Sequence, residues 1–311
     1  MNCRPCFLLL FAAASATAVS RGSEVSAERT AKGVAIKIDG QLFTEYLVRS
    51  GSKPILWPIL GPTGQPVTRS FPMDSAKRET KDHPHQRSLW LTHGDVNGID
   101  FWAETPGSGQ IRHREFVTVR SGRQALLVTR NDWISPDGAK QCEDERRLTF
   151  GADAAGRWID FDTTIRAGDG PVRFGDTKEG AFGVRVAESL CVDAKQGGQI
   201  VNSRGQRDAA TWGQPAEWVD YHGPVDGRTV GIAILNHPGS FRFPTCWHVR
   251  TYGLFAANPF GRKDFGPGGQ RQGPYTLAAG QTLRLKYRIV LHCGDEKAGK
   301  VAAVFAAYAR E

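Results

Sequence analysis

The feature of the sequence that most constrains its fold is a strict alternation near the C-terminus, in the segment QTLRLKYRIVL (residues 281–291). Apolar and basic side chains alternate there, which is the period of a β-strand with one buried and one exposed face. The segment GVAIKIDGQLFTEYLV (residues 33–48) alternates in its first half and resumes after Asp39-Gly40, a pair that favours a two-residue hairpin turn. Both segments predict antiparallel β-structure.

Further short strands are predicted between turn-forming residues along most of the chain. The 36 glycines and 17 prolines suit many strands joined by turns. Residues 50–82 are rich in Pro and Gly and are expected to form a long loop, as a wall or lid of a site. A helix is expected only at Asp295 to Arg310, with Val301, Val304, Phe305 and Tyr308 on one side. The sequence therefore predicts an all-β protein, a large antiparallel β-sandwich with a short C-terminal helix.

The first twenty residues have the pattern of a cleaved signal peptide. Arg4 precedes the apolar run FLLLFAAA, which is too short to span a bilayer, and small residues follow. We therefore expect residues 1–20 to be removed, and residues 21–311 to form one periplasmic or extracellular domain. Cys142, Cys191, Cys246 and Cys293 remain, as free thiols or in one or two disulfides.

Composition excludes some classes of partner. The net charge is +8, but the basic residues are spread along the chain, which favours a solvated surface over a polyanion-binding face. No nucleic-acid module is recognisable. No later segment is apolar enough to span a membrane, and GxSxG, HExxH and phosphate-binding glycine loops are absent from the sequence.

The first candidate cluster is His83 to Trp102, HPHQRSLWLTHGDVNGIDFW. If the chain is extended, His83 and His85 point the same way, and with His93 they are candidate acid–base groups or metal ligands. Metal binding, metal-free chemistry and a structural role all stay open. Trp90 and Trp102 are candidates for stacking on a sugar, or for the core. Asp95 and Asn97 are candidate substrate-binding residues, or turn-capping residues.

Two further clusters follow. Asp176 and Glu179 are candidate general bases in a charged turn between glycines, where Lys178 would stabilise charge. Arg185, on the next strand, would bind a hydroxyl or carboxylate group. The third cluster offers His248 as a catalytic group, with Arg250 and Asn258 as substrate-binding residues.

These clusters carry a resemblance to a known family. The segments HPHQRSLWLTHGDVNGIDFW, DTKEGAFGVRVAESL and CWHVRTYGLFAANPFG resemble the methane-oxygenase-subunit-A-like (PmoA-like) family of secreted or periplasmic proteins. The resemblance covers nearly all of the chain after the signal peptide. It implies a galactose-mutarotase-like supersandwich, in which a histidine acid and a carboxylate base act on a sugar ring. It also implies a functional link to a sugar oxidoreductase.

The leading expectation is therefore a carbohydrate-active enzyme using acid–base chemistry of the isomerase, lyase or hydrolase type. It would need no cofactor, although a divalent metal is compatible with the histidines. Its ligand would be a carbohydrate or a sugar-derived small molecule. A carbohydrate-binding protein without catalysis is the second hypothesis, and a metal-dependent enzyme built on His83 and His85 is the third.

Overall fold

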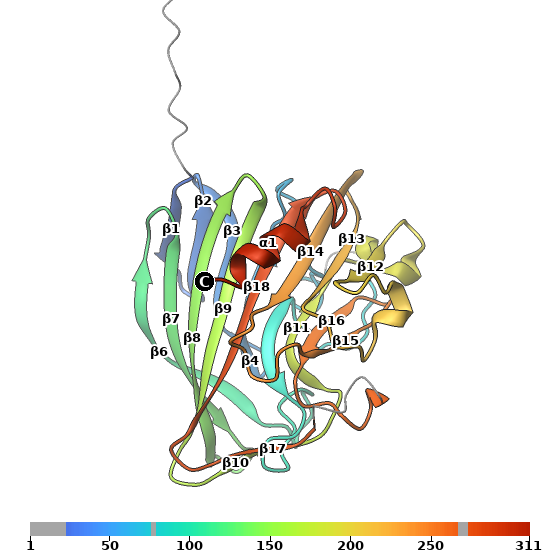
Figure 1. Cartoon of the computed structure of the whole chain (residues 1–311). Coiled ribbons are helices and arrows are strands. Elements are labelled where there is room, and N and C mark those ends of the chain that lie inside the picture. Colours follow the sequence, from blue (N-terminus) through green and yellow to red (C-terminus); the bar gives the residue numbers. More distant parts are fainter. Residues whose placement is uncertain (1–22, 76–78, 267–272) are drawn as a thin grey trace, which may run out of the picture.

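The computed structural model describes residues 23–75, 79–266 and 273–311. The expected signal peptide, residues 1–20, lies outside the described residues. Within the described chain, two large antiparallel sheets of eight strands each face one another, and a two-stranded sheet lies at one end (Figure 1). The predicted fold class, a large antiparallel β-sandwich with a short C-terminal helix, is confirmed.

Sheet 1 contains the N-terminal strands and the strands that carry the three candidate clusters. The order across the sheet is β1 (Val25–Arg29), β2 (Gly33–Ile38), β3 (Gln41–Ser50), β4 (Lys53–Ile59), β5 (Leu89–His93), β11 (Gly180–Arg185), β16 (Leu254–Asn258) and β15 (Cys246–Val249). Strands distant in sequence therefore become neighbours at β5, β11 and β16. The hairpin turn at Asp39-Gly40 has positive φ at both residues, as predicted.

Sheet 2 contains the long central strands. Its order is β12 (Gln199–Asn202), β13 (Trp218–Val225), β14 (Arg228–Asn236), β18 (Thr282–Cys293), β9 (Gly156–Ala167), β8 (Lys140–Asp153), β7 (Ala125–Ile134) and β6 (Gln110–Arg120). The small sheet pairs β10 (Val172–Phe174) with β17 (Tyr275–Leu277). Three short 3-10 helices, η1 (Glu188–Leu190), η2 (Val192–Ala194) and η3 (Asp208–Thr211), complete the connections in the described chain.

The core lies between the inner faces of the two sheets. In β18, Leu283, Leu285 and Tyr287 are buried in it, while Arg284 between them is exposed, which confirms the alternation predicted from the sequence. Burying such apolar side chains contributes about 1.5–3 kcal/mol each. The outer face of each sheet is then left for loops, the helix and polar groups.

The helix α1 (Val301–Tyr308) covers the outer face of sheet 2, where Val301 and Tyr308 are buried (Figure 1). The prediction that it begins near Asp295 is wrong. The Asp295 carboxylate accepts the backbone N–H groups of Lys297 and Ala298, and Lys300 has a left-handed φ of 51°. These contacts form a turn instead of the first helical turns.

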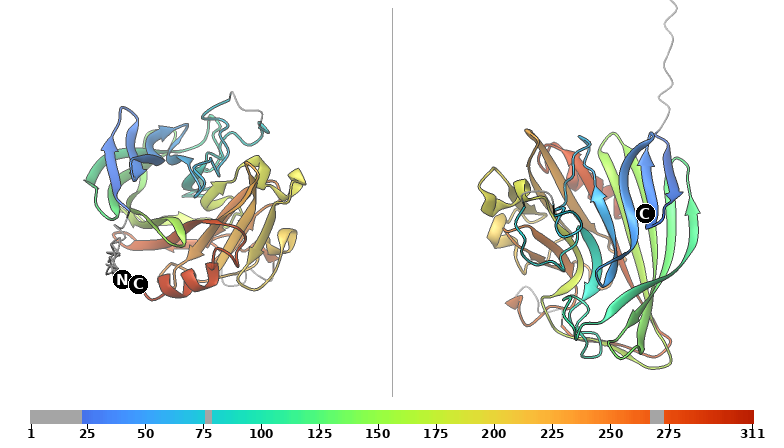
Figure 2. Two further views of the ribbon diagram at one scale, coloured as in Figure 1. Left: turned by 90° about the horizontal axis from the view of Figure 1, so that it is seen from above. Right: turned by 180° about the vertical axis from the view of Figure 1, so that it is seen from behind.

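Residues 50–82 are only partly the loop expected. Lys53–Ile59 form β4, whose Ile55 and Leu56 pair with β5. Pro54 and Pro58 made this segment read as a loop, but both prolines lie outside that two-residue pairing. Residues 60–75 and 79–82 lie on the opposite side of the molecule from α1 (Figure 2, left).

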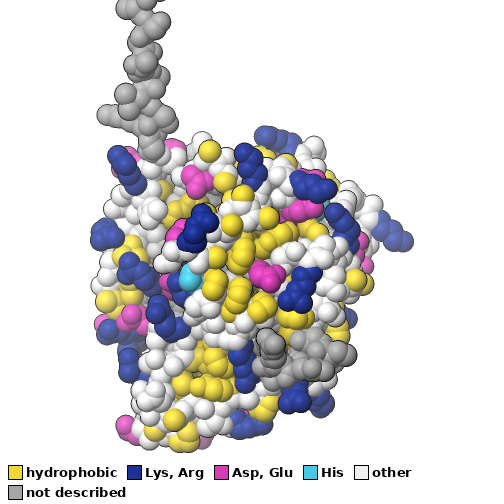
Figure 3. Space-filling view, viewed as in Figure 1, with side chains coloured by type: hydrophobic (Ala, Val, Ile, Leu, Met, Phe, Trp, Pro, Cys, Tyr) yellow, Lys and Arg dark blue, Asp and Glu magenta, His cyan; other side chains and the backbone are white. Residues whose placement is uncertain are grey.

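Cys142, Cys191, Cys246 and Cys293 form no disulfide with one another. In the described segments, no helix is both long and apolar enough to cross a membrane. Lys and Arg side chains are scattered over the face that carries α1, as expected of a solvated basic surface (Figure 3).

Candidate functional site

The outer face of sheet 1 brings the strands of the three clusters side by side. Trp90 on β5, Gly183 on β11 and Ala256 on β16 are in register, and His248 on β15 pairs with Ala256. A Cβ atom at Gly183 would lie 2.7 Å from the Trp90 ring, so only glycine lets the indole lie across β11. Gly183 and Ala256, in the centre of this row, carry no polar side chain. Most polar groups near the row therefore come from the loops around it.

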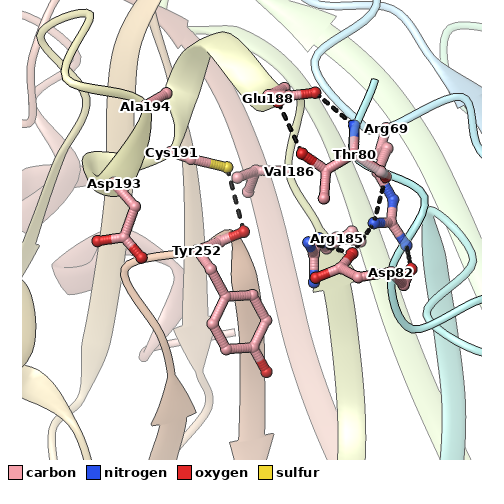
Figure 4. A pocket seen from close by; sticks show the side chains of 10 residues that line it. All are labelled: Arg69, Thr80, Asp82, Arg185, Val186, Glu188, Cys191, Asp193, Ala194 and Tyr252. Carbon is pink, nitrogen blue, oxygen red and sulfur yellow. Dashed lines mark hydrogen bonds and ion pairs between the residues drawn. The ribbon is translucent and has the colours of Figure 1, made fainter. Parts of the chain in front are cut away.

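A cavity of about 180 Å³ lies beside the end of β11 (Figure 4). Three segments distant in sequence form its walls: the β4–β5 loop, the stretch from β11 to η2, and the β15–β16 turn. Its lining mixes cations, carboxylates, a hydroxyl and an aromatic ring, from Arg69, Thr80, Asp82, Arg185, Glu188, Asp193 and Tyr252. Arg69, Thr80 and Asp82 come from the segment expected to form a wall or lid of a site. Arg185 is the one predicted site residue in the lining.

Asp82 is fixed between two guanidinium groups. Its Oδ1 accepts a hydrogen bond from Arg69 and another of 2.8 Å from Arg185 Nη2. Burial acts to raise the pKa of Asp82, but the hydrogen bond from His83 and the charge and hydrogen bonds of the two arginines lower it to about 2. The carboxylate is therefore ionised at every pH at which the protein would work, and serves as a fixed anion.

His83 is oriented by this anion. Its Nδ1 lies 2.8 Å from Asp82 Oδ2, and its ring stacks on Tyr252 at 5.2 Å with an interplanar angle of 6°. Because an ionised carboxylate can only accept, Nδ1 carries the proton, and Nε2 is left to exchange one with a ligand. The residue has a positive φ of 43°, held by hydrogen bonds from Gln86 N–H and Arg69 to its carbonyl.

Tyr252 sits at the centre of the polar groups. The Arg185 guanidinium lies 4.8 Å from its ring and that of Arg250 lies 5.9 Å from it. Burial raises the pKa of Tyr252, so its hydroxyl stays protonated and can donate a hydrogen bond. Arg250 is exposed, and among the described residues its guanidinium contacts only aromatic rings, without an ion pair. That cation is available to a ligand.

His248 joins this arrangement through Trp212, which lies 5.7 Å from the Arg250 guanidinium and 6.5 Å from the His248 ring. The Nδ1 atom of His248 donates a hydrogen bond to the Lys178 carbonyl oxygen at 2.8 Å. Burial lowers the pKa of His248 to about 4. The first and third clusters therefore lie along one continuous row of contacts from His83 to His248. The row links two of the three candidate clusters.

His83 and His85 are not on an extended strand, as the sequence reasoning assumed. Residues 83–86 form a turn, and the two rings meet edge to face at 5.8 Å. His85 lies against Trp102, and burial, with the charge of Lys53, lowers the pKa of His85 to about 4. It is thus neutral at neutral pH, with one ring nitrogen as a donor and the other as an acceptor.

The two tryptophans and His93 are buried. Trp90 and Trp102 are buried at 0% and 2% exposure and pack edge to face, so neither offers a stacking surface. His93 lies on the other face of β5, against Phe174 and Phe260, with Nε2 2.9 Å from the Gly175 carbonyl oxygen. His93 therefore does not join His83 and His85 as a third candidate ligand, because the period of two on β5 turns His93 toward the core.

The polar side chains of the second cluster mainly make hydrogen bonds that stabilise the loops around them. Asp176 Oδ1 accepts the N–H groups of Arg262 and Lys263, and the Asn258 amide donates to the carbonyl oxygens of Thr177 and Lys178. Glu179 is partly exposed and pairs with Lys178 at 3.3 Å. These residues position the loop beside His248 and do not line the cavity.

Asp95 and Asn97 lie in a turn next to β10. Asp95 Oδ1 accepts the Gly98 N–H, and Asn97 Oδ1 accepts the Arg173 N–H. Neither residue lines the cavity, and the turn-capping interpretation fits both.

Sequence reasoning missed Arg69, Asp82 and Tyr252. Of these three residues, only Asp82 could have been selected from the sequence, because it is an acidic residue directly before His83.

Acid is expected to destabilise the fold through the buried histidines. Burial lowers the pKa of His93 and His248 from 6.5 to about 4. Between these values the unfolded chain binds more protons than the folded one, so stability falls as pH drops from 6.5 to 4. Each shift corresponds to on the order of 3 kcal/mol at its limit. Denaturant unfolding at pH 7, 5.5 and 4 measures this, and His93→Gln should flatten the curve; an unchanged slope in that variant contradicts the assignment.

Comparison with solved structures finds remote similarity. The Slr1438 protein from Synechocystis sp. PCC 6803 has a TM-score of 0.36 and 11% identity, over 84% of this chain and 88% of that one. A galactose mutarotase related enzyme from Lactobacillus acidophilus has a TM-score of 0.32 and 8% identity, over 86% of this chain and 97% of that one.

No curated protein matches the sequence. The model of a family of unknown function, DUF6807, matches residues 33–306, which include every strand of the two large sheets except β1, and most of α1. The chain therefore belongs to the DUF6807 family.

Proposed function

We propose that the protein is a carbohydrate-active enzyme that carries out acid–base chemistry on a sugar or a sugar-derived acid. The observation that carries the proposal is the Asp82–His83 pair beside a cavity lined by arginines, carboxylates and Tyr252. A carboxylate that orients an imidazole leaves its other nitrogen free for proton transfer. The mixture of donors and acceptors in the walls suits a molecule rich in hydroxyl groups.

Each group has a separate role in this proposal. His83 Nε2 moves the proton, and Asp82 acts as a positioning residue that fixes the tautomer. The Tyr252 hydroxyl donates to a substrate oxygen, because its raised pKa keeps it protonated. Arg250 binds a carboxylate or a developing oxyanion, since it has no carboxylate partner among the described residues.

The same proposal includes three further points: the resemblance to the PmoA-like family, export directed by a signal peptide at residues 1–20, and a functional link to a sugar oxidoreductase. They rest on the sequence motifs and on the pattern of the first twenty residues. A sugar oxidoreductase would supply or consume an oxidised sugar, whose carbonyl group acidifies neighbouring C–H bonds. Such a substrate suits a histidine base beside arginines.

The experiment follows a panel of neutral sugars, uronic acids and keto-sugars by ¹H NMR in D₂O. Loss of a carbon-bound proton signal, or a new anomeric signal, reports isomerisation, elimination or hydrolysis. We expect conversion by the wild-type protein and its loss in His83→Asn. Saturable binding of a sugar with no conversion of any panel member would instead favour the non-catalytic carbohydrate-binding protein.

A further inference from the structure

A second group of buried titratable side chains lies on the outer face of sheet 2. Asp220 and His222 are two residues apart on β13, so both point away from the core, while His292 comes from β18. Asp220 lies between the two imidazoles, with Oδ1 2.6 Å from His222 Nδ1 and Oδ2 2.6 Å from His292 Nε2. The exposed fractions of Asp220, His222 and His292 are 0%, 4% and 0%. The cavity beside His83 lies on the other sheet and uses none of these residues.

The backbone is shaped around this group. His222, Gly231 and His292 are in register across three strands. Cβ atoms at Gly231 and Gly299 would lie 2.2 Å and 2.3 Å from the His292 ring, so two glycines admit that ring between β14 and the loop after β18. The ring is thereby held in the orientation that donates to Asp220.

Glu296 brings a second carboxylate to the group. It lies in the loop after β18, and its Oε2 is 4.0 Å from His222 Nδ1. Its ion-pair partner is Arg207, at 3.5 Å, whose side chain is half exposed. The loop itself is fixed by Asp295, which accepts the N–H groups of Lys297 and Ala298.

We propose that Asp220, His222 and Glu296 bind a divalent transition-metal ion of the Zn²⁺ class. Their ligand atoms all lie within 4.8 Å of one another. One imidazole nitrogen and two carboxylate oxygens are donors that suit such ions. Ligands about 2.0–2.1 Å from a tetrahedral ion lie roughly 3.3 Å apart. The distances of 2.6 Å and 4.0 Å from His222 Nδ1 lie on either side of that value.

The surroundings supply what a bound ion would need. His292 holds the second oxygen of Asp220, as outer hydrogen-bond partners hold metal-ligating carboxylates. His222 and Glu296 also line an open cavity of about 460 Å³, which has room for water as a further ligand. His222 would bind the ion through Nδ1 as a neutral imidazole, with the proton that Nδ1 now shares with Asp220 moved to Nε2.

The test titrates the full chain, after chelator treatment, with Zn²⁺ by isothermal calorimetry, and with Co²⁺ followed by its visible absorption. We expect one equivalent of Zn²⁺ to bind, and Co²⁺ to give the absorption bands of a site with nitrogen and oxygen ligands. Glu296→Gln and His222→Gln should each weaken Zn²⁺ binding by roughly tenfold or more.

Asp295→Asn is the matched control, because it removes a neighbouring charge and keeps a side-chain oxygen for the loop. Its affinity for Zn²⁺ should stay close to that of the wild type, because Asp295 is not among the proposed ligands. Circular dichroism verifies that each variant is folded. The proposal is overturned if the folded wild-type chain binds no Zn²⁺, or if Glu296→Gln and His222→Gln both keep wild-type affinity. Loss of sugar turnover in His83→Asn has no bearing on this result.

Discussion

Asparagine in place of His83 is expected to lower the turnover number by about 10²–10⁴-fold, the usual contribution of a general acid–base group. Asparagine can still donate a hydrogen bond to Asp82, but it cannot exchange a proton near neutral pH. The side chain is partly exposed, so the fold should tolerate the change. The measurement is turnover of the panel substrate by NMR, with circular dichroism as the check on folding.

Neighbouring variants separate the roles of the pair. Asp82→Asn should change the pH profile of the turnover number, because the imidazole loses the anion that fixes its tautomer. Tyr252→Phe keeps the ring that stacks on His83 and removes only the hydroxyl, so it isolates the proposed hydrogen bond from that hydroxyl to a substrate oxygen. His113→Asn is the matched control, since His113 lies on β6 of the other sheet, contacts Tyr46 and Phe116, and does not line the cavity. Full turnover in His83→Asn would reject the proton-transfer role.

Replacing Asp144 with alanine is expected to lower the free energy of unfolding by about 3–5 kcal/mol, the usual effect of breaking a buried ion pair. Asp144 and Arg146 lie on the inner face of β8, each with an exposure of 1%. The Asp144 carboxylate accepts hydrogen bonds from Arg146, from Asn131 Nδ2 at 2.7 Å and from Trp133 Nε1 at 2.7 Å. Its loss leaves the guanidinium of Arg146 buried without a counter-charge.

A double variant distinguishes the unpaired charge from simple loss of packing. Asp144→Leu combined with Arg146→Met removes both charges, so it should cost less than Asp144→Ala alone. Urea unfolding of the three proteins gives the free energies. A single variant that costs less than about 1 kcal/mol would mean that water reaches Arg146 and that the pair is not isolated.

Local patterns predicted the strands well, and the limits of those patterns explain the errors. The alternation of residues 281–291 and the turn at Asp39-Gly40 depend on neighbouring residues alone, and both appear as expected in β18 and in the β2–β3 hairpin. β4 was missed because its prolines read as a loop, and sheet pairing overrode that signal. The helix was predicted too long because the sequence does not show the Asp295 turn in advance.

The candidate site could be predicted from local patterns less fully than the strands. Sequence reasoning selected His83, Arg185, His248 and Arg250, but it paired His83 with His85 and His93 on the assumption of an extended segment. In the structure His83 pairs with Asp82 and stacks on Tyr252, while His93 faces the core. The turn at residues 83–86, which no local pattern announced, decided this difference.

The sequence by itself determined the strands with a clear alternation and their buried faces, because the period of two is a local property of the chain. The tertiary structure alone decided which polar groups meet. The placement of β11 between β5 and β16 brings Arg185 beside Tyr252, and the pairing of β13, β14 and β18 brings His222 near His292. Strand order is set by packing of the whole core, so these sites become visible only when distant strands are neighbours.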